Sequence, residues 1–147
     1  MRRHIETALS VWGLPADAVR FVGTLWDAIQ AIDDIKDGTA LANVDDAIRT
    51  LIVDLPCDPF LGRHRASLAP VLVTAYLKWQ AANDAEASRA PGELDKAYVW
   101  RASFYDVVML VVALCLPEPD ARRLAPAVMA LYGETREDYL KEFAPYA

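Results

Sequence analysis

Histidine and cysteine are scarce in this chain, which has two of each among 147 residues. His4 and His64 lie far apart, and neither Cys57 nor Cys115 belongs to a Cys-x-x-Cys pair or a Cys/His cluster. Structural zinc sites need four such ligands at regular spacing, so the sequence argues against zinc. We expect two reduced, buried thiols, with a structural disulfide as the alternative.

Basic charge is also in short supply. Fifteen Lys and Arg face 21 Asp and Glu, which gives a net charge of −6. Nucleic-acid binding depends on clustered Lys and Arg, and the basic residues here are scattered. We therefore expect no nucleic acid as a partner.

Long apolar runs are missing as well. The longest, Val107–Leu116, has ten residues, whereas a membrane span needs about 20. Near the N-terminus, Glu6 interrupts any signal-like apolar segment. These features predict a soluble, cytoplasmic protein with no membrane contact.

What the chain has in quantity is apolar surface: hydrophobic residues make up 54% and charged residues 24%. A chain of 147 residues is long enough for one domain with a core of its own. The apolar excess favours a surface that is shared with another copy or with a protein partner.

Helical spacing of apolar residues recurs in almost every segment, and no segment shows sustained alternation or an Asn-Gly hairpin signal. We therefore predict an all-α fold, a single compact bundle of six to seven helices over residues 1–147. Its centre is an antiparallel hairpin of helices at Leu68–Ala82 and Glu93–Leu116.

Proline, glycine and capping residues set the other expected helix ends. Pro70 predicts either a kink in one long helix or a new helix capped by Ser67. The remaining helices are expected over Ile5–Val11 and Pro15–Asp37, after Asn43, after Asp58, between Pro117 and Gly133, and after Thr135.

Three aspartates, Asp33, Asp34 and Asp37, crowd the end of the second helix, in the stretch "AIQAIDDIKDGTA". With Ile29 at the centre of the buried face, a helical wheel places Asp33 on the core-facing stripe and Asp37 at its edge. Asp34 points outward. Like charges at i, i+4 and the negative end of the helix dipole both oppose this arrangement, so we expect a cation.

That cation is either Mg²⁺, which takes one or two carboxylates and keeps several waters, or an arginine from a neighbouring helix. The further alternative is a solvated helix end. The "IDDIKD" stretch resembles the aspartate-rich motif of class I isoprenoid (prenyl diphosphate) synthases. That resemblance implies that Asp33, Asp34 and Asp37 bind Mg²⁺ and, through it, a substrate diphosphate.

Three looser similarities accompany this one. The segment "NDAEAS" resembles the second metal motif of terpene cyclases, although Ala87 and Pro91 replace its serine and glutamate. The "SFYDVVMLVVAL" helix is similar to the ExxD helix of all-α nucleotide pyrophosphohydrolases, with Ser103 in place of the glutamate. In overall style the chain resembles small helical proteins of tailed phages and prophages.

Asp106 is the most anomalous residue, because it directly precedes the ten-residue apolar run. We expect it to bond to a Tyr, Trp or Arg of a neighbouring helix, or to face Asp33 as part of a metal site. Arg101 lies about 140° from it on the wheel and needs a partner of its own. His64 and Arg65 complete the buried polar candidates, with His64 expected to cap or pack and its basic neighbours to pair with an acidic helix end.

No complete catalytic set emerges from these residues. The leading hypothesis is a non-catalytic helical interaction protein that self-associates and derives from a phage. The rival is a Mg²⁺-dependent enzyme or binder that acts on a diphosphate.

Overall fold

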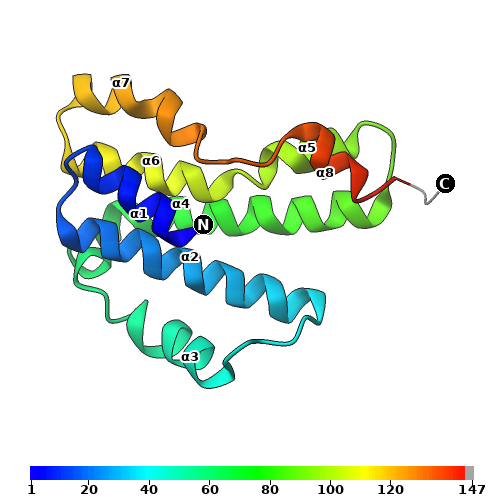
Figure 1. Ribbon diagram of the computed structural model, residues 1–147, viewed down its shortest axis with the longest axis horizontal. Helices are drawn as coiled ribbons and strands as arrows, with labels where there is room; N and C mark the ends of the chain where they lie inside the picture. Colours follow the sequence, from blue (N-terminus) through cyan, green and yellow to red (C-terminus); the bar gives the residue numbers. More distant parts are fainter. Residues whose placement is uncertain (145–147) are drawn as a thin grey trace. The chain divides into compact units, whose positions relative to one another are not determined.

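The structure is a computed structural model that describes residues 1–144, and all regular secondary structure in this range is helical (Figure 1). The prediction of an all-α fold is confirmed. The described chain divides into two compact units. Unit 1 comprises residues 1–67 and 114–116, and unit 2 comprises residues 68–113 and the chain from 117 onward. A single domain over the whole chain stays a prediction.

Unit 1 begins with two helices joined by a tight turn, in which Gly13 has a positive φ of 86°. Its elements are α1 (Arg2–Val11), α2 (Ala16–Asp37), α3 (Val44–Arg49), the π-helix η1 (Thr50–Asp54) and the start of α4 (Pro59–Ser88). The expected caps are present: the Asn43 side chain accepts a bond from the amide of Asp46 at 3.1 Å. Asp58 likewise accepts bonds from the amides of Phe60 and Leu61 at 2.9 and 3.1 Å.

The core of unit 1 lies where α1 and the beginning of α4 meet α2. Phe21 and Phe60 stack with ring centroids 5.5 Å apart. The fully buried large side chains of this unit are Ile5, Leu9, Phe21, Val22 and Phe60. Burying each stabilises the fold by about 1.5–3 kcal/mol, so this end of α2 is firmly held.

Unit 2 contains the rest of α4, α5 (Glu93–Trp100), α6 (Ser103–Cys115) except for its last two residues, α7 (Glu118–Met129) and α8 (Arg136–Lys141). The predicted antiparallel hairpin is present: Arg101 bonds Asn83 of α4, and Asp106, further along the chain, bonds Lys78, nearer the start of α4. The helix expected over Glu93–Leu116 is divided by a turn at Arg101 and Ala102. In unit 1, by contrast, the π-helix η1 follows α3 directly, with no residue between them.

Helix α4 bends at His64, whose φ of −111° and ψ of 18° are not helical. Of the two expectations for Pro70, a kinked long helix describes α4, but the kink lies six residues before the proline. From Arg65 onward the backbone stays helical through Pro70.

The 23-residue stretch Glu93–Cys115 is long and apolar enough to cross a membrane by length and composition. Much of its apolar surface is used inside the fold, because Val107, Val108, Val111 and Val112 are buried. Arg101 lies within the stretch and pairs with Glu86 of α4. These contacts are those of a core helix in a globular protein.

Candidate functional site

The three aspartates lie in the last turns of α2, and the helix ends after Asp37 as predicted. Gly38 takes the left-handed conformation with φ 70°, which glycine adopts without a steric penalty. The amide of Thr39 donates to the carbonyl of Asp34 at 2.9 Å and closes the helix end. Asp33 and Asp34 are half-buried, and Asp37 is exposed.

The buried face of α2 is rotated from the one we predicted. Ile29, the expected centre, is only half-buried, and Ile32 is exposed. The buried positions are instead Ala18, Phe21, Val22, Gly23, Leu25, Ala28 and Ala31. Small residues let helices approach closely, so the buried face of α2 includes alanines. Our prediction gave more weight to the larger aliphatic residues and therefore placed the buried face wrongly. Asp33 therefore lies beside the core-facing stripe and not on it.

Asp106 is bound by a lysine, and our expectation of a Tyr, Trp or Arg partner is wrong. The ammonium of Lys78 on α4 donates to Asp106 Oδ2 at 2.8 Å. Both side chains are about two-fifths exposed, so this carboxylate sits at the edge of the apolar surface. Asp33 belongs to unit 1 and Asp106 to unit 2, and a metal site that joins the two carboxylates stays a prediction.

Arg101 has the partner of its own that the sequence required. Its Nε donates to Glu86 Oε1 at 2.8 Å, and a terminal nitrogen bonds Glu86 Oε2. The same nitrogen donates to Asn83 Oδ1 at 2.7 Å. The Tyr139 hydroxyl of α8 donates to Glu86 Oε1 at 2.7 Å. The Arg101 and Glu86 side chains are only 22% and 15% exposed, so most of this ion pair is shielded from water.

Around this network lies an apolar and aromatic cluster, which we call the α4–α5–α8 cluster. Burial and the bond to Glu86 both raise the pKa of Tyr139. The cluster consists of Ala82, Ala85, Ala97 and Tyr139, with Leu94, Tyr98, Trp100, Leu140 and Phe143 packed against them.

The sequence analysis did not identify Glu86 and Asn83 as the hydrogen-bond partners of Arg101. Both lie in "NDAEAS", at i and i+3 on the face of α4 that turns toward α5. Two polar residues at helical spacing in an alanine-rich helix were the available signal. The Asn83 Nδ2 amide is buried without a hydrogen-bond partner in the described residues.

Of the other two buried polar candidates, His64 agrees with the prediction and Arg65 does not. His64 is half-buried, and its ring lies 4.5 Å from that of Phe60, centroid to centroid, which agrees with a packing role. Arg65 is exposed, so its place among buried candidates is wrong, because an unpaired guanidinium stays in water. The basic segment does pair with an acid at a helix end, but it is Arg63 with Asp17 at the start of α2. The bond from Arg63 lowers the pKa of Asp17.

The thiols also differ from expectation in one respect. Cys57 and Cys115 are both free, as predicted, but Cys57 is exposed. Burial raises the pKa of the half-buried Cys115 thiol.

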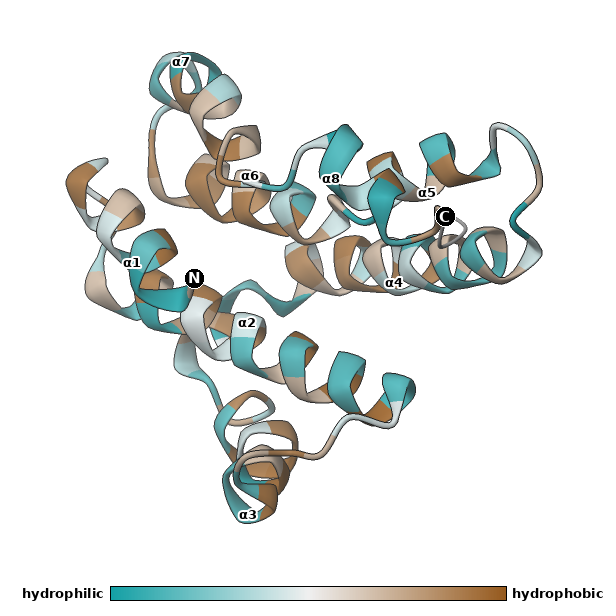
Figure 2. Cartoon of the chain, turned by 45° about the vertical axis from the view of Figure 1, so that its right-hand side comes forward, coloured by the Kyte–Doolittle hydropathy of each residue, from teal (hydrophilic) through white to brown (hydrophobic). Residues whose placement is uncertain are grey.

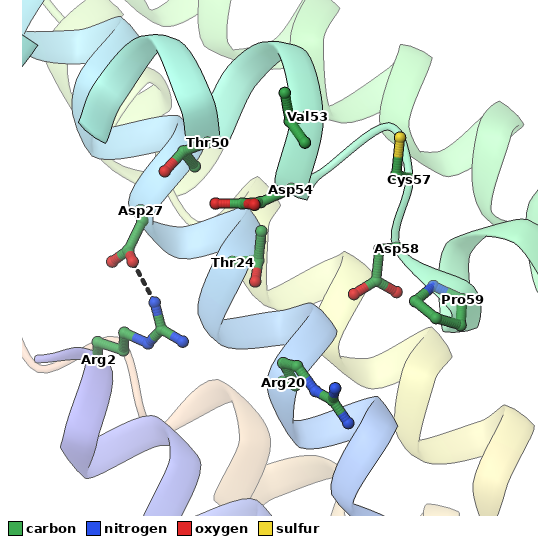
Figure 3. A pocket seen from close by; sticks show the side chains of 10 residues that line it. All are labelled: Arg2, Arg20, Thr24, Asp27, Thr50, Val53, Asp54, Cys57, Asp58 and Pro59. Carbon is green, nitrogen blue, oxygen red and sulfur yellow. Dashed lines mark hydrogen bonds and ion pairs between the residues drawn. The ribbon is translucent and has the colours of Figure 1, made fainter. Parts of the chain in front are cut away.

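A cavity of about 390 Å³ opens on unit 1 between α1, α2, η1 and the segment before α4 (Figure 3). Arg2 at its edge donates to Glu6 at 2.9 Å and also bonds Asp27. Gly23 makes room for this pair, since a Cβ there would lie 2.4 Å from Glu6 Oε1. The remaining charged lining residues are Arg20, Asp54 and Asp58. The cavity thus offers both signs of charge to a small polar molecule.

No group of three or more His, Cys, Asp or Glu in residues 1–144 is arranged to hold a metal ion. The magnesium site at Asp33, Asp34 and Asp37, with or without Asp106, stays a prediction.

The most distinctive surface of unit 1 is the outer face of α3 and η1. No residue between Val44 and Asp54 is buried. Val44, Ile48 and Ile52 follow one another at i, i+4 and i+8 and are 54%, 50% and 68% exposed; we call them the α3–η1 ridge. Figure 2 shows brown, hydrophobic segments along this part of the chain. In unit 2, Val73, Tyr76 and Leu77 form a second exposed apolar face, on α4.

Comparison of the chain with models of protein families, with curated proteins and with solved structures finds no match.

Proposed function

We propose that this chain is a small helical interaction protein that self-associates in the cytoplasm. The observation that supports the proposal most is the α3–η1 ridge. Helices of globular proteins normally bury an apolar stripe against their own fold, and an exposed stripe of aliphatic side chains marks a contact surface. Two free thiols are in keeping with a reducing compartment.

The test is the oligomeric state, measured by sedimentation velocity across micromolar concentrations. We expect the average mass to rise with concentration for the native chain, and Ile48→Asp to remain a monomer. Val11→Asp is the matched control, because Val11 is 78% exposed at the end of α1 and lies outside the ridge. A native chain that stays monomeric throughout contradicts the proposal.

The second candidate is a Mg²⁺-dependent enzyme or binder for a diphosphate. The favouring observation is the three carboxylates in the last turns of α2, where the helix dipole is also negative. A bound cation would stabilise the folded chain. Titration with Mg²⁺ or Mn²⁺ should then release or absorb heat and raise the melting temperature.

Asp33→Asn separates this candidate from the first. Loss of metal-dependent stabilisation in Asp33→Asn, with full retention in the control Asp84→Asn on the exposed side of α4, would support the metal site. Absence of any heat or melting shift in the native chain argues against it and leaves the interaction protein.

A further inference from the structure

Resting on the proposed self-association, we infer its geometry: the α3–η1 ridge pairs antiparallel with the same ridge of a second copy. Ile48 lies on the twofold axis, and Arg49 lies beside Asp45 of the partner subunit.

The ridge has the form of a helix-pairing surface. Its three aliphatic side chains repeat every four residues along one side of a continuous helical segment. Such i±4 rows pack against the rows of another helix with axes about 8–10 Å apart. A twofold dimer uses the same patch on both subunits, so one ridge on each chain is sufficient to form the interface.

The register follows from the helical rise of about 1.5 Å per residue. With the axis at Ile48, Val44 lies about 6 Å to one side. Ile52 of the partner subunit lies opposite it, slightly nearer the axis, because the wider turn of η1 rises less per residue than an α-helix. Every aliphatic residue of the ridge then meets another one. A shift by one turn would leave a ridge residue of each copy uncovered.

The flanking charges are self-complementary in this orientation. Asp45 and Arg49 stand four residues apart, on the same flank of the ridge. An antiparallel twofold pair brings equal flanks together, so Arg49, about 1.5 Å from the axis, comes within about 3 Å along the helix of Asp45 of the partner subunit. A parallel pair would instead turn Arg49 toward the flank with Ala47 and Leu51, where it meets aliphatic side chains.

Arg49 is available for this contact. Within its own chain, its Nε lies 3.3 Å from Asp54 Oδ1, and the arginine side chain is 71% exposed. The two terminal guanidinium nitrogens have no bond in the described residues and can bind a second carboxylate. The nearby Asp45, Asp46 and Asp54 also make an anionic membrane or a nucleic acid an unsuitable occupant.

Disulfide cross-linking tests the register, in a chain with Cys57→Ser and Cys115→Ser. A disulfide needs Cα atoms about 4.4–6.8 Å apart. Under mild oxidation, Ile48→Cys should link to itself. Val44→Cys should link to Ile52→Cys in a mixture, but not to itself, because two Val44 positions lie about 12 Å apart along the helix. Self-linking of Val44→Cys as fast as that of Ile48→Cys would indicate a parallel pair and overturn the inference.

Charge exchange tests the flanks. Arg49→Asp and Asp45→Arg alone should each weaken dimerisation about tenfold, since two like-charge contacts replace two exposed ion pairs. A mixture of the two variants should form a heterodimer, and the double variant Asp45→Arg/Arg49→Asp should regain native affinity. Single variants that dimerise as tightly as the native chain contradict the flank pairing, provided circular dichroism shows native helix content.

The outcomes separate this inference from the proposed function. A monomeric native chain removes both. A native dimer that ignores the ridge variants but dissociates with Leu77→Asp on α4 preserves self-association and overturns the α3–η1 interface.

Discussion

The α3–η1 segment and the α4–α5–α8 cluster use apolar residues in opposite ways. In the cluster, small alanines and aromatic rings enclose an ion pair and leave little of it in water. In α3–η1, three large aliphatic side chains lie half or more in solvent. The cluster is stabilised by its own contacts, whereas α3–η1 leaves its aliphatic side chains exposed for contact with another molecule. The contrast teaches that a chain rich in apolar residues can place many of them where only an external contact would bury them.

The largest expected effect lies in the cluster. Arg101→Ala leaves the enclosed Glu86 carboxylate without its cation, and removal of one partner from a buried pair is costly. Since both side chains keep some solvent contact, we expect a loss of about 2–3 kcal/mol in the free energy of unfolding. Urea denaturation measures it. Lys96→Ala, which breaks the exposed pair with Glu93, is the control and should change stability by less than about 0.5 kcal/mol.

Alkaline pH should destabilise unit 2, which contains Tyr105 on α6. Burial raises the pKa of Tyr105 to about 12, against about 10 in an unfolded chain. The folded state therefore holds this proton longer, and stability is full below pH 10 and falls between pH 10 and about 12. Denaturation at a series of pH values should show a smaller decline for Tyr105→Phe. Tyr76→Phe, at an exposed tyrosine of α4, should decline like the native chain.

The α3–η1 segment buries none of its residues, and α3 begins at a side-chain cap. Asn43→Ala removes the acceptor for the Asp46 amide and should cost about 1 kcal/mol. Because α3 buries no residue, the loss should appear as faster amide exchange in residues 44–49. Equal exchange in the native chain and the variant would show that other contacts hold this helix.

The smallest effect is expected on the ridge itself. Ile48→Ala and Ile52→Ala remove side chains that are at least half exposed, so monomer stability should change by less than about 0.5 kcal/mol, as at ordinary surface positions. Denaturation at low protein concentration checks this. A loss above 2 kcal/mol, of the size found in cores, would place these residues in the interior and erase the contrast with the cluster.

Local chemistry made much of the fold predictable. Asn43, Asp58 and Thr135 cap helices as expected, and Gly38 ends α2. Each of these interactions joins residues close in sequence, so its energy does not depend on the rest of the fold. The same holds for the all-α class, which follows from the apolar period.

Tertiary contacts made the rest unpredictable. That Arg101 finds Glu86, and Asp106 finds Lys78, depends on how α4 packs against α5 and α6. Which face of α2 is buried depends on the helices that pack against it. Alanines of α2 are buried there, whereas Ile29 is not. For the site, the sequence identified Arg101 as needing a partner but had no means of choosing one.

The π-helix η1 also bears on how this chain tolerates change in length. A π-helical turn holds one more residue than an α-helical turn. Deletion of one residue from Thr50–Asp54 can therefore convert η1 to α-helix while its flanking residues keep their places. In most helices, a one-residue deletion rotates everything that follows by about 100°. This segment is thus a place where the gene can lose a codon and keep the cap at Asp58.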